Sequence, residues 1–152
     1  MKQKIQLKAG FTLIEVLIVA TIISLLASVG ITSYTSFNQN SRDARRKADL
    51  EQIRGALELY RSNNSTYPTA SGTYGLPFGT AGLSDATNTY MSKIPNDPKN
   101  GFTYYYTLSS GEYTIGALLE GSSTCAAAAG TDCQETAGTQ NCNYCIGPYG
   151  QK

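Results

Sequence analysis

GFTLIEVLIVATIISLLASVGI, residues 10–31, is the stretch that decides the fold of this chain. Its apolar run, 11–31, holds a single charged residue, Glu15, and is otherwise interrupted only by small polar residues and one glycine. About 21 residues at about 1.5 Å each make a helix of about 30 Å, which matches the hydrocarbon core of a bilayer. The run therefore predicts a helix that enters a membrane.

The charge distribution indicates which end of the chain lies on which side of that membrane. Three of the twelve lysines and arginines, Lys2, Lys4 and Lys8, precede the apolar run, so the remainder carries nine cations against eleven anions, a net charge of −2. Positive flanks favour the cytoplasmic side, which places the C-terminal body outside. A body with this balance is not a basic nucleic-acid binder by bulk charge. One basic group could contact nucleic-acid or lipid phosphates: Arg42, Arg45, Arg46 and Lys47. Because Asp43, Asp49 and Glu51 are interleaved with it, this group is interpreted as a solvated helix face.

After the apolar run, helix-compatible sequence continues to Asn63 and becomes amphipathic. Leu50, Ile53, Leu57 and Tyr60 recur at steps of three and four residues, which is the spacing of one helix face. A chain of 152 residues has room for one globular domain beside this rod, so half of the rod must be covered by something else.

The remaining sequence predicts loops and one hairpin. Residues 65–101 are rich in turn signals, whereas 102–108 and 112–119 are β-rich runs joined by Ser-Ser-Gly. Packing the hairpin on the amphipathic helix face would form a small core. The predicted fold class is α+β, with a long N-terminal helix whose outer half packs on a small antiparallel sheet. The predicted sections are a leader (1–10), a transmembrane or filament-core helix (11–31), a globular domain (32–120) and a Cys-rich C-terminal loop region (121–152).

All four cysteines, Cys125, Cys133, Cys142 and Cys145, lie in the last 28 residues. An even number in an outward-facing, loop-rich segment indicates disulfides, whereas zinc is disfavoured because the chain has no histidine and only Cys142-x-x-Cys145 has ligand spacing. Sequential pairing, Cys125 with Cys133 and Cys142 with Cys145, closes the shortest loops. Its second bridge is strained by the two-residue spacing, so the other two connectivities stay open.

Glu15 is the residue that an ordinary signal peptide or a plain membrane anchor does not explain. A carboxylate at the centre of a bilayer costs about 2.5–3.5 kcal/mol, and less near the ends. Cleavage after Gly10 would create an amino group on Phe11, one helical turn away and at the positive end of the helix dipole. Between subunits, the same two charges would set the stagger of packed helices, because an unpaired Glu15 would be left in an apolar bundle.

Gly10 followed by Phe-Thr-Leu-Ile-Glu and a long apolar run resembles the type III signal of type IV pilins and type II secretion pseudopilins. The resemblance implies a pilin fold, and it implies that a membrane aspartyl prepilin peptidase cuts after Gly10 and methylates Phe11. It also implies that Glu15 guides assembly by engaging the N-terminus of a neighbouring subunit.

The similarity continues to about residue 119 and is closest to the major pseudopilin. The matching positions are Lys47-Ala48-Asp49, Ile53, Ala56-Leu57, Tyr60, Asn64, Tyr67-Pro68-Thr69, Asp97-Pro98, Asn100-Gly101, Tyr104 and Tyr106. Two departures stand out. Gly30-Ile31-Thr32 replaces the proline that bacterial pilins commonly carry there, and the acidic calcium loop is not recognisable, with Asp132 and Glu135 remaining among the cysteines.

The predicted function is structural, with no enzymatic activity and no cofactor. Its expected partners are copies of itself in a helical filament, the prepilin peptidase, the inner-membrane assembly platform with its ATPase, and membrane lipid before assembly; nucleic acid is not expected. The subunit would sit in the inner membrane with its N-terminus in the cytoplasm and then in an extracytoplasmic filament, either a pilus or a secretion pseudopilus. The alternatives are a minor pilin or competence pseudopilin that binds DNA or a surface at a filament tip, and a plain single-span membrane protein.

Overall fold

The computed structural model describes residues 10–70, 76–121, 125 and 141–152, and it divides into two compact units, Met1–Asn38 and Gln39–Lys152. One helix, α1 (Leu13–Asn64), runs from the first unit into the second. This confirms the long helix predicted from the apolar run and the amphipathic pattern that follows it.

The C-terminal end of α1 is closed by a left-handed turn. Ser65 has a φ of 60°, and its N–H donates to the carbonyl of Arg61 at 2.7 Å. The side-chain amide of Asn64 donates to the carbonyl of Tyr60 at 3.1 Å. These bonds satisfy carbonyls that the last turn of a helix leaves free.

The second unit contains a four-stranded antiparallel sheet in the order β3-β4-β5-β6. Its strands are β3 (Tyr105–Ser109), β4 (Glu112–Ala117), β5 (Tyr144–Gly147) and β6 (Gly150–Gln151). The predicted hairpin is confirmed as β3 and β4, joined by Ser110 and Gly111, which both have positive φ. Two such residues form the turn whose twist matches that of paired strands.

The prediction of loops was wrong in part for two regions, 65–101 and 121–152, because both contain short strands. Within the Cys-rich region, β5 pairs with β4 through Ile115 and Ile146, and β6 pairs with β5. Within 65–101, β1 (Leu83–Ser84) pairs with β2 (Thr89–Met91). These strands are two to four residues long, too short to show an alternating pattern, and they are defined by the strands that they pair with.

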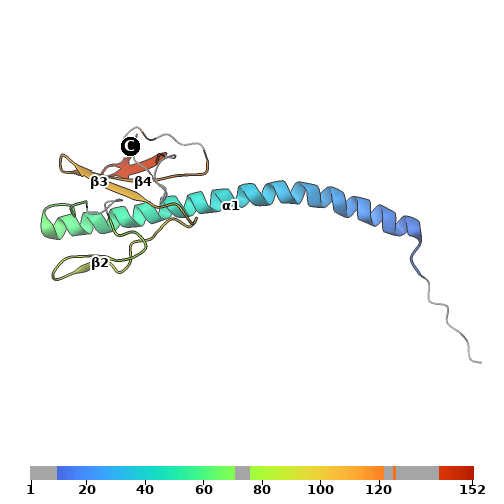
Figure 1. The fold of residues 1–152 in the computed structure, drawn as a ribbon, viewed down its shortest axis with the longest axis horizontal. Coiled ribbons are helices and arrows are strands. Elements are labelled where there is room, and N and C mark those ends of the chain that lie inside the picture. Colours follow the sequence, from blue (N-terminus) through green and yellow to red (C-terminus); the bar gives the residue numbers. More distant parts are fainter. Residues whose placement is uncertain (1–9, 71–75, 122–124, 126–140) are drawn as a thin grey trace, which may run out of the picture. The chain divides into compact units, whose positions relative to one another are not determined.

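The core lies where the C-terminal half of α1 meets these sheets. Leu50, Ile53 and Leu57 are buried on the helix, as the amphipathic pattern predicted, whereas Tyr60 is only partly buried. The hairpin and the residue before it supply Tyr104, Tyr106, Tyr113, Ile115 and Ala117. Residues Leu76, Phe78, Leu83 and Ile94 complete the cluster. Figure 1 shows β2 on a different side of this helical segment from β3 and β4.

Candidate membrane and assembly site

The first unit carries an uncovered apolar surface. The helix α1 is long and apolar enough to cross a membrane. Nothing in the described chain covers the most apolar part of this helix. The large apolar side chains of this part are 53 to 89% exposed; they are Phe11, Leu13, Ile14, Val16, Leu17, Ile18, Val19, Ile22, Ile23, Leu25, Leu26, Val29 and Ile31. A contiguous surface of this kind requires lipid or other protein to cover it.

The polar interruptions of this run are satisfied within the helix itself. The hydroxyls of Thr21, Ser24 and Ser28 donate to the carbonyls of Ile18, Ala20 and Leu25 at 2.7, 2.8 and 2.8 Å. In a hydrocarbon environment an unpaired hydroxyl is costly, and these bonds remove that cost. The small polar residues are therefore compatible with a helix that lies in lipid.

Glu15 closes a capping box at the start of α1. The backbone N–H of Thr12 and its hydroxyl both donate to Glu15 Oε2, at 2.8 and 2.6 Å, and the N–H of Glu15 donates to the Thr12 hydroxyl at 3.3 Å. The sequence pattern Thr-x-x-Glu is the signature of this motif. Sequence reasoning singled out Glu15 but missed Thr12, although the spacing was present.

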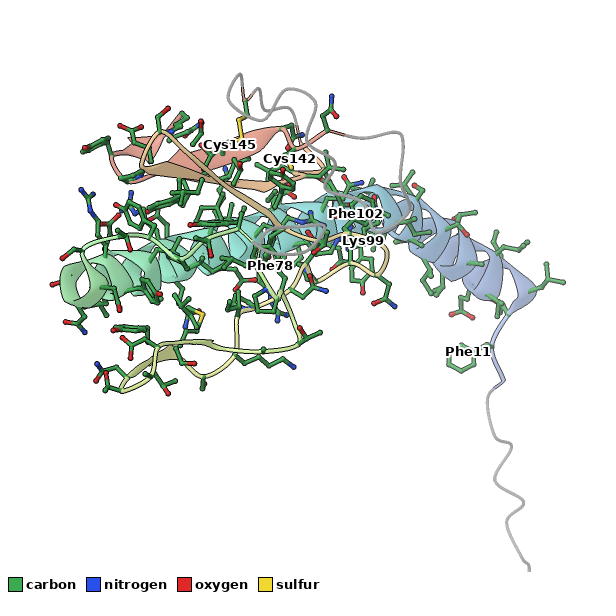
Figure 2. All side chains as sticks on the ribbon, turned by 60° about the vertical axis from the view of Figure 1, so that its left-hand side comes forward. Phe11, Phe78, Lys99, Phe102, Cys142 and Cys145 are labelled. Carbon is green, nitrogen blue, oxygen red and sulfur yellow. A yellow bond between two sulfur atoms is a disulfide. The ribbon has the colours of Figure 1, made fainter. Side chains whose placement is uncertain are left out.

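Gly10 and Phe11 precede the helix and are both exposed, so the peptide bond between them is accessible in the described chain. A Cβ built on Gly10 would meet nothing within 4 Å. Phe11 and Glu15 line one open groove with Val16, Val19, Ala20 and Ile23. Figure 2 shows the Phe11 ring beside the start of the helix. The structure thus brings Gly10, Phe11 and Glu15 to one end of the apolar surface.

The disulfide arrangement differs from sequential pairing. Cys125 is bonded to Cys145, with 5.7 Å between their Cα atoms, and Cys142 is disulfide-bonded as well. Cys133 lies outside the described residues. Loop entropy favours the shortest loops only where nothing else brings the ends together. Here the pairing of β5 with β4 does so, and the side chain of Asn143 bonds the N–H and the carbonyl of Leu119 at 2.6 and 2.9 Å.

Gly116 makes room for these sulfur atoms. It lies opposite Cys145 in the β4–β5 ladder, and its neighbours Ile115 and Ala117 face the core. A Cβ at this position would approach the Cβ and Sγ atoms of Cys142 to 3.0 and 3.1 Å. Figure 2 shows both cysteines on the sheet. The cysteines therefore pack on the face of β4 that turns away from the core.

A cluster of charged residues ties α1 to two distant segments of the second unit. Arg46 donates to both carboxylate oxygens of Asp97, at 2.7 and 2.9 Å, and to Asp43 at 2.7 Å and Glu120 at 3.1 Å. Arg42 donates to both oxygens of Glu120, at 2.6 and 2.7 Å. The interpretation of this arginine group as a solvated face was wrong for Arg46, which is 0% exposed.

The charges in this cluster stabilise one another. The hydrogen bond from Arg42, reinforced by Arg46, lowers the pKa of Glu120 to about 2. Burial disfavours the charged form of Arg46, but the hydrogen bonds and the charge of Asp97 outweigh it, so the pKa of Arg46 is raised above its ordinary value. A carboxylate that accepts charged hydrogen bonds and a guanidinium that donates them are both held in their ionised forms.

The carboxylates of this cluster do not fit a calcium site. Calcium takes six to eight oxygen ligands, whereas the oxygens of Asp97 and Glu120 are occupied by guanidinium groups. In the ranges that the structure describes, no group of three acidic, His or Cys residues is placed to hold a metal. Asp132 and Glu135 lie outside those ranges.

Two successive segments of the chain match known family models. A capped apolar helix that continues into a helix-on-sheet domain is the arrangement of the pilin class, and residues 6–31 match the prokaryotic N-terminal methylation motif. Residues 33–135 match the type II secretion system protein G family. The chain belongs to this family of pseudopilins.

Curated relatives of this chain are all type II secretion system core proteins G. The protein from Vibrio cholerae serotype O1 is 28% identical over 125 residues, 76% of this chain and 84% of the relative. The protein from Klebsiella pneumoniae is 30% identical over 71% of this chain and 79% of its own length. The protein from Escherichia coli K12 is 31% identical over 72% of this chain and 78% of its own length. No solved structure gives a significant match.

Proposed function

We propose that this chain is the precursor of a pseudopilin that polymerises into a filament of the type II secretion system. The observation that carries the proposal is the uncovered apolar surface of 11–31, with the capping bonds between Thr12 and Glu15 at its start, in a member of the protein G family. In this proposal residues 1–10 are a leader, 11–31 form the membrane span and later the filament core, and the rest of the chain is the globular domain.

Processing is the first step of the proposed mechanism. A prepilin peptidase cuts the exposed bond between Gly10 and Phe11, and the new amine of Phe11 is methylated. The methylation motif matched over 6–31 supports this step. Before assembly the subunit is held in the inner membrane, with its N-terminus in the cytoplasm.

Assembly then exchanges lipid for other copies of the same helix. Because lipid tails are as apolar as the side chains of 11–31, the hydrophobic effect does not drive this exchange. In this proposal an ATPase-driven platform in the inner membrane supplies the work that moves the helix out of lipid and into the filament. Packing between helices and specific polar contacts must then hold the filament together.

Glu15 is proposed to provide such a contact. Its bonds to Thr12 use one carboxylate oxygen, Oε2, which leaves Oε1 to accept from the Phe11 amine of a neighbouring subunit. An amine and a carboxylate in an apolar bundle attract strongly, and either one left alone is costly. The pair would fix the stagger between adjacent helices.

Three substitutions separate this role from helix capping. Glu15→Leu removes both the capping box and the charge, and Glu15→Gln keeps a capping side chain without the charge. Thr12→Val removes the two bonds of the Thr12 hydroxyl but keeps the Glu15 charge and its bond from the backbone N–H of residue 12. The measurement is the ratio of sheared filament to mature subunit in the membrane, in cells that express only the variant. Glu15→Leu and Glu15→Gln are expected to be cleaved and inserted but not polymerised, whereas Thr12→Val polymerises. Filaments from Glu15→Gln at the wild-type ratio would contradict the charge pair.

A further inference from the structure

Two exposed aromatic side chains follow the apolar run on α1. Tyr34 is 67% exposed and Phe37 is 71% exposed, and both belong to the first unit of the chain. They are three residues apart, so their side chains are neighbours on one side of the helix. The membrane-entering run alone does not account for them, because they lie beyond its last residue, Ile31.

The residues around this aromatic pair are polar but uncharged. Residues 32–41 contain Thr, Ser, Asn and Gln besides the two rings, and the first charge after Glu15 is Arg42. The ring of Tyr34 is amphipathic, and tyrosine is enriched in the layer between the hydrocarbon core and bulk water; the apolar ring of Phe37 lies one turn further along the same side. The composition therefore favours a lipid headgroup layer over open solvent.

The spacing along the helix gives the same location. Tyr34 and Phe37 follow Ile31 by about 4.5 and about 9 Å along the axis, and each polar layer of a bilayer is about 5–7 Å thick. Side chains of a helix lean toward its N-terminus, which brings both rings back toward the hydrocarbon core. From Leu13, where α1 begins, to Phe37 the rise is about 36 Å, so Phe11, two residues before the helix, lies near the opposite edge of a bilayer about 40–45 Å thick.

We propose that Tyr34 and Phe37 bind the outer headgroup layer of the bilayer and, with Phe11 at the opposite layer, set the depth of the helix before assembly. This inference rests on the membrane-held stage of the proposed function. At that depth Glu15 lies near the inner interface, where a carboxylate costs less than at the centre. The bond after Gly10 is then held at the membrane surface on the leader side.

Depth-dependent quenching of tryptophan fluorescence tests the proposal, because the chain contains no native tryptophan. The full-length variants Tyr34→Trp, Phe37→Trp and Ile22→Trp are placed singly in phosphatidylcholine vesicles. The acyl chains of the lipid carry bromine either near the ester or near the terminal methyl. For Y34W and F37W, quenching by the shallow bromine is expected to exceed quenching by the deep bromine about twofold, with the reverse order for the mid-span variant I22W.

The outcomes separate this inference from the function on which it rests. If I22W is quenched by the deep bromine while Y34W and F37W are quenched by neither, the helix spans the bilayer but the aromatic pair does not bind it. If their emission follows the protein-to-lipid ratio rather than the bromine position, a second copy of the chain covers the rings. Either result overturns the proposal about Tyr34 and Phe37 but leaves the proposed function intact. An unquenched I22W overturns the membrane-held stage as well.

A second comparison tests whether the pair sets the depth. In the I22W background, the double variant Y34S/F37S is expected to change the ratio of deep to shallow quenching about twofold, because the outer anchor is lost. The matched control S33A/S36A changes two residues with the same spacing and leaves the rings in place. An unchanged ratio in Y34S/F37S would show that the apolar run alone sets the depth, and would overturn this part of the proposal.

Discussion

Arg46 and Asp97 lie 51 positions apart in the chain and form a two-bond ion pair, at 2.7 and 2.9 Å, with both side chains 0% exposed. Asp97 also accepts from the N–H of Lys99 at 2.8 Å. Because the pair is buried, removing either member would leave the other as an uncompensated buried charge, which strongly destabilises a fold. This relationship joins the outer half of α1 to the turn that precedes β3, and Glu120 joins the same guanidinium to the segment after β4.

Replacement of Arg46 is therefore expected to be costly. Arg46→Met leaves Asp97 buried without its partner, and the free energy of unfolding should fall by about 3–5 kcal/mol. Arg46→Lys keeps the charge but not the two-bond geometry, so an intermediate loss is expected. Urea titration of the full chain in detergent micelles measures both effects.

The neighbouring Arg45 provides the control for this prediction. Its side chain is 66% exposed and lies 3.9 Å from Asp49, an exposed pairing of a kind that contributes little. Arg45→Met should change the free energy of unfolding by less than about 0.5 kcal/mol. Equal losses for Arg45→Met and Arg46→Met would show that the buried pair is not the source of the effect.

Acid should weaken the second unit through Glu120. Its pKa is lowered from 4.5 to about 2, so its contribution is complete above pH 4.5 and is lost as the pH falls toward 2. Glu120→Gln should be less stable than the wild type at pH 7, and this difference should shrink over that window. The pKa of Asp85 is also lowered, chiefly by the Tyr90 hydroxyl, so part of the acid sensitivity should remain.

Thermal unfolding from pH 7 to pH 2 measures this dependence. Glu112→Gln is the matched control, because the Glu112 carboxylate is about half exposed and lies 3.5 Å from Lys152. The unfolding temperature of Glu112→Gln should stay close to that of the wild type at every pH. A Glu120→Gln difference that does not change with pH would contradict the role assigned to the Glu120 charge.

Disulfide connectivity is testable by digestion without reductant. Glu135 is the single glutamate after Glu120, so a glutamate-specific protease separates residues 121–135, with Cys125, from 136–152, with Cys145. The bond between these cysteines should keep the two peptides linked until a reductant is added. Release of two separate peptides before reduction would support sequential pairing. We also expect the exported protein to contain no free thiol.

Processing should depend on the glycine before the cleavage site. Gly10→Val is expected to accumulate as an unprocessed precursor in the membrane, because a branched side chain would obstruct the approach of the peptidase. A Cβ at Gly10 meets nothing within 4 Å in the subunit itself, so a folding defect is not expected. The mass of the N-terminal peptide distinguishes precursor from mature chain.

Gly30→Ala serves as the control, since a Cβ there also meets nothing within 4 Å and the residue lies at the far end of the apolar run. This variant should be processed normally. Normal maturation of Gly10→Val would contradict the proposed cleavage site. For the wild type, the mature peptide should begin at Phe11 with the added mass of one methyl group.

Local periodicity in the sequence was sufficient for the helix and the first hairpin. The apolar run, the helix face of Leu50, Ile53 and Leu57, and the alternation in β3 and β4 all repeat over neighbouring positions, so each predicts its own structure. The Gly10-Phe11 motif is equally local. The capping box of Thr12 and Glu15 is local as well, since its Thr-x-x-Glu pattern lies within four neighbouring positions.

Only the tertiary structure decided which distant residues meet. The bond between Cys125 and Cys145, the pairing of β5 with β4 and the bonds of the buried Arg46 to Asp97 and Glu120 join segments 20 to 74 positions apart. No short-range pattern encodes such contacts, because each depends on chain segments that folding alone brings together. A cysteine or an arginine has the same local sequence whether it ends exposed or buried, and its partner is set by the packing of α1 against the sheet.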